Sequence, residues 1–266
     1  MLIDSHCHLV YQGLAERQDE VLAAARARGV GGFLNISTRQ EEWGAVIAVA
    51  DREPDVWASV GVHPHEADAH PDLGAAALVE AAAHPKVIAI GECGLDYYYD
   101  KSDRAAQRER FSAHIEAARQ TGLPLVIHTR DAEDDTAEML IRGVATGGVN
   151  GVLHCFTGSQ KLADIALGLG FYISLSGIVT FKNAADLQAT AKTVPDDRLL
   201  VETDAPFLAP VPNRGKTCEP AFVADTAAFV AGLRGVSPDE IAATTTANFF
   251  RLFGKACPER SRGGRA

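Results

Sequence analysis

Short apolar segments rich in valine and isoleucine recur along this chain, and longer helical stretches separate them. Strands that alternate with helices in this way form parallel sheets, because each helix returns the chain to the edge where the previous strand began. The expected strands span residues 2–6, 32–36, 56–62, 87–92, 125–128, 151–155, 171–175 and 198–204. The longest expected helices span residues 14–28, 103–121 and 132–145.

Eight strand–helix units in a chain of 266 residues favour a closed barrel over an open sheet. A (β/α)₈ TIM barrel typically takes ~250 residues. No glycine-rich phosphate loop follows the first strand, which disfavours a nucleotide-binding open sheet. We therefore expect one α/β domain, a single (β/α)₈ TIM barrel over residues 1–254, followed by a disordered basic tail over residues 255–266.

Two helix starts carry the capping-box pattern, in which a hydroxyl residue precedes an acidic residue by three positions. Thr38 with Glu41 is one case, and Ser237 with Glu240 is the other. The second case also places Pro238 at the first helical position, where proline fits best.

Net charge and cysteine usage narrow the class of protein. The formal net charge is −10, which disfavours a protein that coats long stretches of phosphate backbone. The five cysteines form no CxxC pair and are odd in number, as expected in a reducing compartment. Because no cleavable leader and no run of ~18 apolar residues is visible, we expect a cytoplasmic protein without a membrane span, most simply a monomer.

Polar side chains stand where five of the expected strands end. Residues two apart on a strand point to the same face, and all strand ends of a barrel meet at one opening, where barrel enzymes place their active sites. The converging set is His6, His8, Glu92, His128, His154 and Asp204. A single histidine near a strand end is usually a hydrogen-bonded core residue, but six polar groups buried together need water or a metal to satisfy them.

Six imidazole and carboxylate ligands suit two divalent ions, Mg²⁺, Mn²⁺ or Zn²⁺. The expected bridge is Glu92, since a carboxylate can give one oxygen to each ion. The first ion is assigned to His6, His8 and Asp204, and the second to His128 and His154. Two ions would hold a hydroxide that attacks a phosphodiester.

Other groups near the strand ends receive supporting roles. Asp204 is the candidate general base, and Asp4 and Glu202 are expected to orient imidazoles or metal-bound water. Cys7, Cys93 and Cys155 each neighbour a proposed ligand, so strand alternation predicts that they face the helix layer as small apolar residues.

Five motifs, in order and spacing, resemble the TatD-type metal-dependent DNases. They are Asp4-Ser5-His6-Cys7-His8-Leu9, Gly61-Val62-His63-Pro64-His65, Gly91-Glu92-Cys93-Gly94-Leu95-Asp96-Tyr97, Leu153-His154-Cys155-Phe156 and Glu202-Thr203-Asp204-Ala205-Pro206. The resemblance covers residues 1–254. It implies a TIM-barrel hydrolase of the wider amidohydrolase type, a divalent-metal cofactor, and 3′→5′ exonuclease activity on single-stranded DNA. The metal ligands that it implies are the same six residues.

The resemblance also points to groups that would hold substrate. His63 resembles the substrate-contacting histidine of the family, and Arg130, Arg214 and Lys216 are candidate phosphate contacts. Asn213, Thr217 and Cys218 depart from the family pattern, which has a histidine and an Arg-Asn pair at these places.

Two further groups are expected to be structural. The tyrosines at 97–99 are expected to pack their loop on the barrel rim, with stacking on a terminal base as the alternative. The remaining histidines are expected to lie outside the converging set; they are His65, His70, His84 and His114.

The leading hypothesis is thus a hydrolase of ester bonds, a deoxyribonuclease that acts on single-stranded DNA ends. One alternative is an amidohydrolase-like enzyme that cleaves an amide, a lactone or an ester, because an activated hydroxide attacks carbon and phosphorus alike. A second alternative is a catalytically silent protein that binds metal or nucleic acid.

Overall fold

The computed structural model describes residues 1–256, in which eight parallel strands alternate with helices. The strands are β1 (Leu2–Cys7), β2 (Val30–Asn35), β3 (Val56–Val60), β4 (Val87–Asp96), β5 (Leu125–Arg130), β6 (Gly151–Leu153), β7 (Tyr172–Leu175) and β8 (Leu199–Val201). The helices of the described residues are α1 (Gln18–Ala27), α2 (Trp43–Arg52), α3 (Ala75–Ala82), α4 (Arg104–Thr121), α5 (Glu133–Ala145), α6 (Gln160–Gly168), α7 (Ala185–Thr193), α8 (Val223–Arg234) and α9 (Pro238–Leu252).

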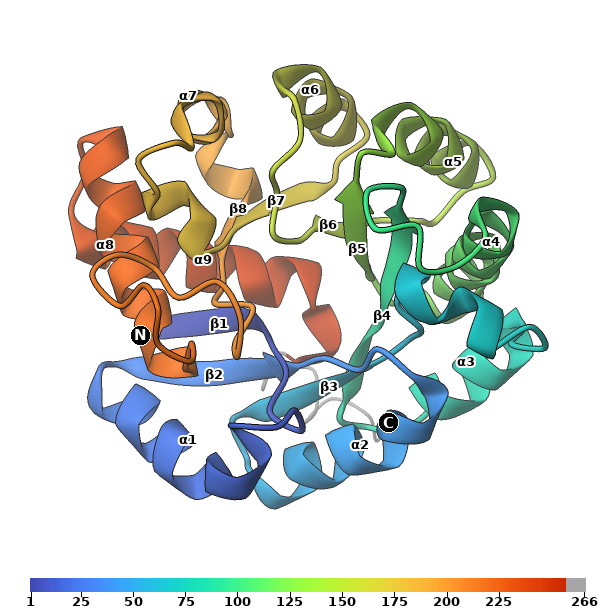
Figure 1. The fold of residues 1–266 in the computed structure, drawn as a ribbon, viewed down its shortest axis with the longest axis horizontal. Helices are drawn as coiled ribbons and strands as arrows, with labels where there is room; N and C mark the ends of the chain where they lie inside the picture. The colour runs from blue at the N-terminus through green and yellow to red at the C-terminus, as the bar shows by residue number, and fades with distance from the viewer. Residues whose placement is uncertain (257–266) are drawn as a thin grey trace, which may run out of the picture.

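The strands pair in sequence order from β1 to β8, and the last lies beside the first. Closure takes place just beyond β8, where Asp204 N donates to His6 O over 2.9 Å and His8 N donates to Ala205 O over 2.8 Å. Figure 1 shows the strands as an inner ring inside a ring of helices. The predicted (β/α)₈ TIM barrel is therefore confirmed.

The apolar core has two layers. Leu22, Phe33 and Phe111 belong to the outer layer between strands and helices. The inner layer fills the barrel itself, and there Phe249 and Phe253 join side chains of the strands. Since Asn248 and Thr246 of α9 donate to Leu199 O and Met1 O, α9 covers the end of the barrel where the strands begin (Figure 1). The opposite end, where the strands finish, is here called the mouth.

Helices α4 and α9 begin where a side chain caps the free backbone amides of the first turn. The Asp103 carboxylate accepts hydrogen bonds from Ala105 N and Ala106 N, which fixes the start of α4 at the predicted place. The capping box of Ser237 and Glu240 is confirmed at α9. The predicted capping box at Thr38 is wrong, because Glu42 rather than Glu41 binds the Thr38 amide and hydroxyl.

The chain stays packed slightly beyond the expected domain end. Lys255 Nζ donates to Ala82 O and His84 O over 2.9 and 2.8 Å, and Ala256 is buried. These two residues therefore belong to the folded body rather than to the expected tail, whose remaining residues, 257–266, lie outside the described part of the chain. No helix among residues 1–256 is long and apolar enough to cross a membrane.

The residue after β3, Gly61, approaches β4 very closely just before Glu92. A Cβ on Gly61 would lie 2.3 Å from the carbonyl carbon of Gly91, so only a glycine fits there. Gly61 O also accepts a hydrogen bond from the Trp43 indole over 3.0 Å. This contact sets the position of the backbone that carries Glu92.

Gly61→Ala is expected to destabilise the protein by about 3 kcal/mol, since the added methyl group meets backbone that cannot move aside. Gly44→Ala is the matched control, because a Cβ at this position of α2 meets no atom within 4 Å. That change is expected to be neutral or to stabilise by up to ~1 kcal/mol. Urea unfolding of both variants measures the difference, and equal stabilities would show that β3 and β4 can separate freely.

Candidate metal centre

The buried carboxylate of Glu92, near the middle of β4, lies at the centre of a cluster of imidazoles. Histidines reach it from β1, from β5 and from the residues that follow β1, β3 and β6, and Asp204 arrives from the segment after β8. The structure brings together all six residues that the strand ends predicted as ligands, with His63 beside them.

The Oε2 atom of Glu92 faces the two histidines of the first motif. His6 Nε2 lies 3.4 Å from it and His8 Nε2 lies 3.8 Å away. Asp204 Oδ1 completes this group at 3.5 Å from His6 Nε2 and 3.3 Å from His8 Nε2. Two nitrogens and two carboxylate oxygens thus lie close enough together to bind one ion.

The Oε1 atom of the same carboxylate faces a different set of imidazoles. His154 Nε2 lies 2.8 Å away, His63 Nε2 lies 3.3 Å away, and His128 Nδ1 lies 3.4 Å away. The two oxygens of Glu92 therefore belong to two separate groups of nitrogen donors.

Two buried carboxylates hold the far sides of the second group. Glu202 Oε1 accepts from His154 Nδ1 over 3.2 Å and from Cys155 N over 2.7 Å. Asp96 Oδ2 lies 2.9 Å from His128 Nε2. Glu202 thus contacts an imidazole as predicted, whereas Asp96 is a site residue that the sequence reasoning missed.

Charge pairing sets the protonation of the centre. Burial opposes the ionisation of Glu92, but the charge of His154 and the hydrogen bond from its ring outweigh burial and hold the pKa of Glu92 well below its usual range. Burial also disfavours the charged form of His154, yet Glu92 and Glu202 raise the pKa of His154 well above its usual value. Against the same burial, His8 and His6 lower the pKa of Asp204. Ionised carboxylates are thus balanced here by protons on imidazoles, which a divalent cation would displace.

The donor set fits divalent metal ions. The ligand atoms of His6, His8 and Glu92 all lie within 4.8 Å of one another, and so do those of His63, Glu92 and His128. Imidazole nitrogen and carboxylate oxygen are the ligands that Zn²⁺ and Mn²⁺ take readily. Burying several imidazoles this closely around one carboxylate destabilises the folded state unless a cation binds their nitrogens.

The Asp4 carboxylate binds backbone and a threonine hydroxyl instead of an imidazole ring. It accepts from Thr203 N over 2.9 Å, from Thr203 Oγ1 over 2.6 Å and from His6 N over 3.3 Å. Burial raises the pKa of Asp4 to about 8. Asp4 therefore fastens the backbone of β1 to the segment after β8, and the prediction that it orients an imidazole ring is wrong.

A cavity of about 770 Å³ opens above the centre at the mouth. Glu92, His128, His154 and Asp204 lie at its base. The predicted substrate contacts His63 and Arg130 also line it, whereas Arg214 and Lys216 are absent from its wall. Arg214 instead lies over the Phe181 ring at 3.9 Å, and Lys216 contacts Asn213.

Aromatic and basic side chains form the upper wall of the cavity. Tyr99 and Phe207 line it and are each about half exposed. The Arg130 guanidinium lies 4.0 Å from the ring centre of Tyr98 and 4.7 Å from that of Tyr99. Tyr97 instead packs inward, and its hydroxyl donates to Asp135 over 2.6 Å. The expectation that the tyrosine loop packs on the rim therefore applies to Tyr97 but not to its two neighbours.

Two residues assigned elsewhere by the sequence lie in this cavity. His65 was expected outside the converging set, but it lines the mouth and its Nε2 is 2.9 Å from Asp96 Oδ2. Cys155 was expected to face the helix layer, but it is half-buried in the cavity wall with a φ of +42°. Strand alternation fails there because β6 ends at Leu153. Cys7 and Cys93 do lie in the outer core layer as predicted.

Asp96 could have been found from the two-residue period of a strand. It stands four residues after Glu92, and β4 continues through it instead of ending at Glu92. Extending the predicted strand would have placed both carboxylates on one face.

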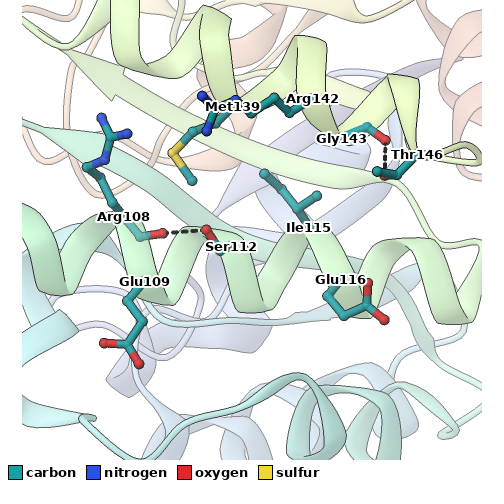
Figure 2. Close-up of a pocket in the computed structure, with 9 residues that line it drawn as sticks. All are labelled: Arg108, Glu109, Ser112, Ile115, Glu116, Met139, Arg142, Gly143 and Thr146. Carbon is teal, nitrogen blue, oxygen red and sulfur yellow. Dashed lines mark hydrogen bonds between the residues drawn. The ribbon is translucent and has the colours of Figure 1, made fainter.

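A second hollow, of about 330 Å³, lies on the outer surface between α4 and α5 (Figure 2). Its wall shares no residue with the mouth cavity. Figure 2 shows that Ser112 and Thr146 turn back to carbonyls of their own helices. Gly143 leaves room for Ile115 of the neighbouring helix, so this hollow is a packing feature between two helices.

Comparison with known proteins gives the same picture. The sequence pattern of the TatD related DNase family matches residues 3–254. The chain is 46% identical over 255 residues to the uncharacterized metal-dependent hydrolase YcfH of Escherichia coli K12, and covers 95% of each chain. It is 37% identical over 241 residues to a protein of Cronobacter sakazakii named 3′-5′ ssDNA/RNA exonuclease TatD, and covers 89% of this chain and 91% of that one.

A solved structure is similar along nearly the whole length. The crystal structure of YJJV, a TatD homologue from Escherichia coli, superposes with a TM-score of 0.88 at 29% sequence identity, and covers 95% of this chain and 98% of that chain. The barrel, the metal-fitting cluster and these likenesses agree, and the chain belongs to the TatD related DNase family of metal-dependent hydrolases.

Proposed function

We propose that this hydrolase is a two-metal phosphodiesterase that removes nucleotides from the 3′ end of single-stranded DNA. The observation that carries the proposal is the division of the Glu92 carboxylate, whose two oxygens face two separate groups of imidazoles. A carboxylate whose two oxygens face different groups of nitrogens would suit a pair of divalent ions.

The residues divide between two ions, Mg²⁺, Mn²⁺ or Zn²⁺. His6, His8 and Asp204 would hold the first, and His128 and His154 would hold the second, with Glu92 between them. Bound there, the ions would supply Lewis acidity that activates water and balances charge on the phosphate. Glu202 keeps His154 Nε2 directed at Glu92 by accepting from the opposite ring nitrogen.

Asp204 is proposed as the general base. It lies in the cavity wall, and its carboxylate is 14% exposed, so an attacking water can reach it. Its lowered pKa keeps it ionised, which is the form that a general base needs. Its φ of +61° turns the backbone so that the side chain projects from the segment after β8 into the mouth.

His63 is suited to hold a phosphate oxygen. Its Nδ1 accepts from His65 N over 3.1 Å, so the proton of the neutral ring lies on Nε2, which faces the cavity base. Burial lowers the pKa of His63 to about 4, which keeps the ring neutral. The ring is therefore an N–H donor rather than a free metal ligand.

The cavity wall favours a single strand over a duplex. The half-exposed rings of Tyr99 and Phe207 can stack on unpaired bases, a contact that every base can make. Arg130 adds a positive charge beside the tyrosines and is proposed to contact phosphate. Arg214 and Lys216 lie outside this wall, so we propose them only for phosphates farther along the strand. The exonuclease name of the Cronobacter relative supports a nucleic-acid substrate.

The first prediction from the proposed function separates the roles of Glu92 and Asp204. Glu92→Ala is expected to lose at least one bound ion, because both groups depend on this side chain. Asp204→Asn is expected to keep more metal and to lower turnover by roughly a hundredfold or more, since it removes the base. Metal content by mass spectrometry and initial rates measure the two effects.

A control for this pair is Glu16→Ala, a change of an exposed carboxylate that hydrogen-bonds only locally, to Gly13 N. Activity and metal content should match the parent protein in this variant. Full activity in either Glu92→Ala or Asp204→Asn would contradict the assignment.

The second prediction concerns the reaction itself. Metal-stripped protein given Mg²⁺, Mn²⁺ or Zn²⁺ is expected to shorten a single-stranded oligonucleotide labelled at its 5′ end, one nucleotide at a time from the 3′ end. The stripped protein and a fully duplex substrate are the controls. If protein with two bound ions leaves DNA intact but hydrolyses amides, lactones or esters, the carbonyl alternative replaces this proposal. If it turns over neither class, the protein is a binding protein.

The third prediction is a weak salt dependence. A chain with a net charge of −10 that holds only terminal nucleotides makes few phosphate contacts. The slope of log affinity against log salt should correspond to no more than about four neutralised phosphates. Fluorescence anisotropy of a labelled oligonucleotide on Asp204→Asn protein measures it, and a steeper slope would indicate an extended binding surface.

A further inference from the structure

The carboxylate of Asp96 is fully buried between the metal-fitting cluster and the tyrosine loop. The side chain of Gln107 in α4 holds the backbone of Asp96 at both its amide and its carbonyl. Asp96 N donates to Gln107 Oε1 over 2.8 Å, and Gln107 Nε2 donates to Asp96 O over 3.1 Å. The position of this carboxylate is therefore set by β4 and α4 rather than by the histidines around it.

The two oxygens of Asp96 have different partners. Oδ1 accepts from the backbone amides of Tyr98 and Tyr99 over 3.1 and 2.9 Å. Oδ2 accepts from His128 Nε2 over 2.9 Å. His65 Nε2 also lies 2.9 Å from Oδ2, but its geometry makes no hydrogen bond. The hydrogen bond of Oδ2 therefore belongs to His128.

A carboxylate can only accept, so the hydrogen bond to Asp96 keeps a proton on His128 Nε2. In the neutral ring the lone pair is then on Nδ1, which is the atom that faces Glu92 Oε1 at 3.4 Å. His154 shows the opposite arrangement, with Nδ1 on Glu202 and Nε2 toward Glu92. Two histidines thus face one oxygen through different nitrogens, and each is held from behind by its own buried carboxylate.

We propose that Asp96 is a positioning residue that fixes the tautomer of His128 and so makes Nδ1 the atom offered to a divalent ion beside Glu92. This inference rests on the proposed two-metal function. It adds that the second ion depends on a residue that does not touch it, and that this residue also anchors the loop carrying Tyr98 and Tyr99.

Asp96→Asn is a sharp test because an amide has one acceptor and one donor. The amides of Tyr98 and Tyr99 are donors, so the side-chain oxygen must stay with them. The new NH₂ group then faces His128 Nε2 and stabilises the lone pair there, which moves the ring proton to Nδ1. A proton on Nδ1 blocks the atom that the second ion needs.

The experiment reads the tautomer directly. Long-range ¹H–¹⁵N spectra of the metal-free protein at alkaline pH, with His128→Gln used for assignment, should show His128 protonated on Nε2 in the parent and on Nδ1 in Asp96→Asn. Zinc titration should show affinity for the second ion about 10- to 100-fold weaker in Asp96→Asn, with the first ion unchanged. His65→Ala is the matched control, because it removes the other imidazole at Oδ2 and should leave both readings as in the parent.

A parent His128 protonated on Nδ1 would overturn the inference without any variant, so a failure of Asp96→Asn to fold leaves it testable. An Asp96→Asn protein with the parent tautomer, or with unchanged affinity for the second ion, would also overturn it. If the parent protein takes up fewer than two ions, the proposed function fails, while the tautomer spectra still decide the role of Asp96.

Discussion

The shared carboxylate of Glu92 is the contact on which the rest of the mouth depends. Each of its oxygens faces a different set of nitrogens, so a shift of this one side chain would disturb both sets at once. Close backbone contacts and hydrogen bonds surround this residue. Gly61, just after β3, lies in direct backbone contact with Gly91 of β4 beside it. Two of the imidazoles that face Glu92 are also held from behind, His154 by Glu202 and His128 by Asp96.

The apolar packing at the closed end of the barrel explains how the mouth can hold so many buried polar side chains. Phe249 of α9 and Phe253 just after it complete an apolar core beneath the strands, which needs no polar partners. Charged groups are concentrated instead at the strand ends, where they contact one another and the cavity. This separation lets the fold bury imidazoles and carboxylates together without weakening the part of the barrel that holds the strands in register.

Sequence reasoning predicted the barrel and the six converging residues, because strand order and strand-end position follow from local patterns. It failed at two places where the chain leaves its strand and at two carboxylates within strands. Cys155 follows the end of β6 and turns into the cavity through a left-handed backbone, which alternation cannot foresee. His65 reaches the mouth from a 3₁₀ segment, and Asp96 was missed because β4 continues beyond Glu92, the last residue of the predicted strand. Asp4 was predicted to orient imidazoles or metal-bound water, and only the structure shows that it binds Thr203 instead.

The glycines of β4 limit which positions can change when the protein evolves to act on new substrates. A Cβ on Gly91 would lie 2.5 Å from Val126 O and one on Gly94 would lie 2.0 Å from His128 O, at φ values of +146° and +125° that other residues rarely adopt. In a randomised library, β4 should therefore tolerate almost no replacements at these positions. Phe207 and Ile178 of the cavity wall carry no such restriction, so laboratory evolution of this scaffold would change selectivity through the wall and leave the strand that bears Glu92 unchanged.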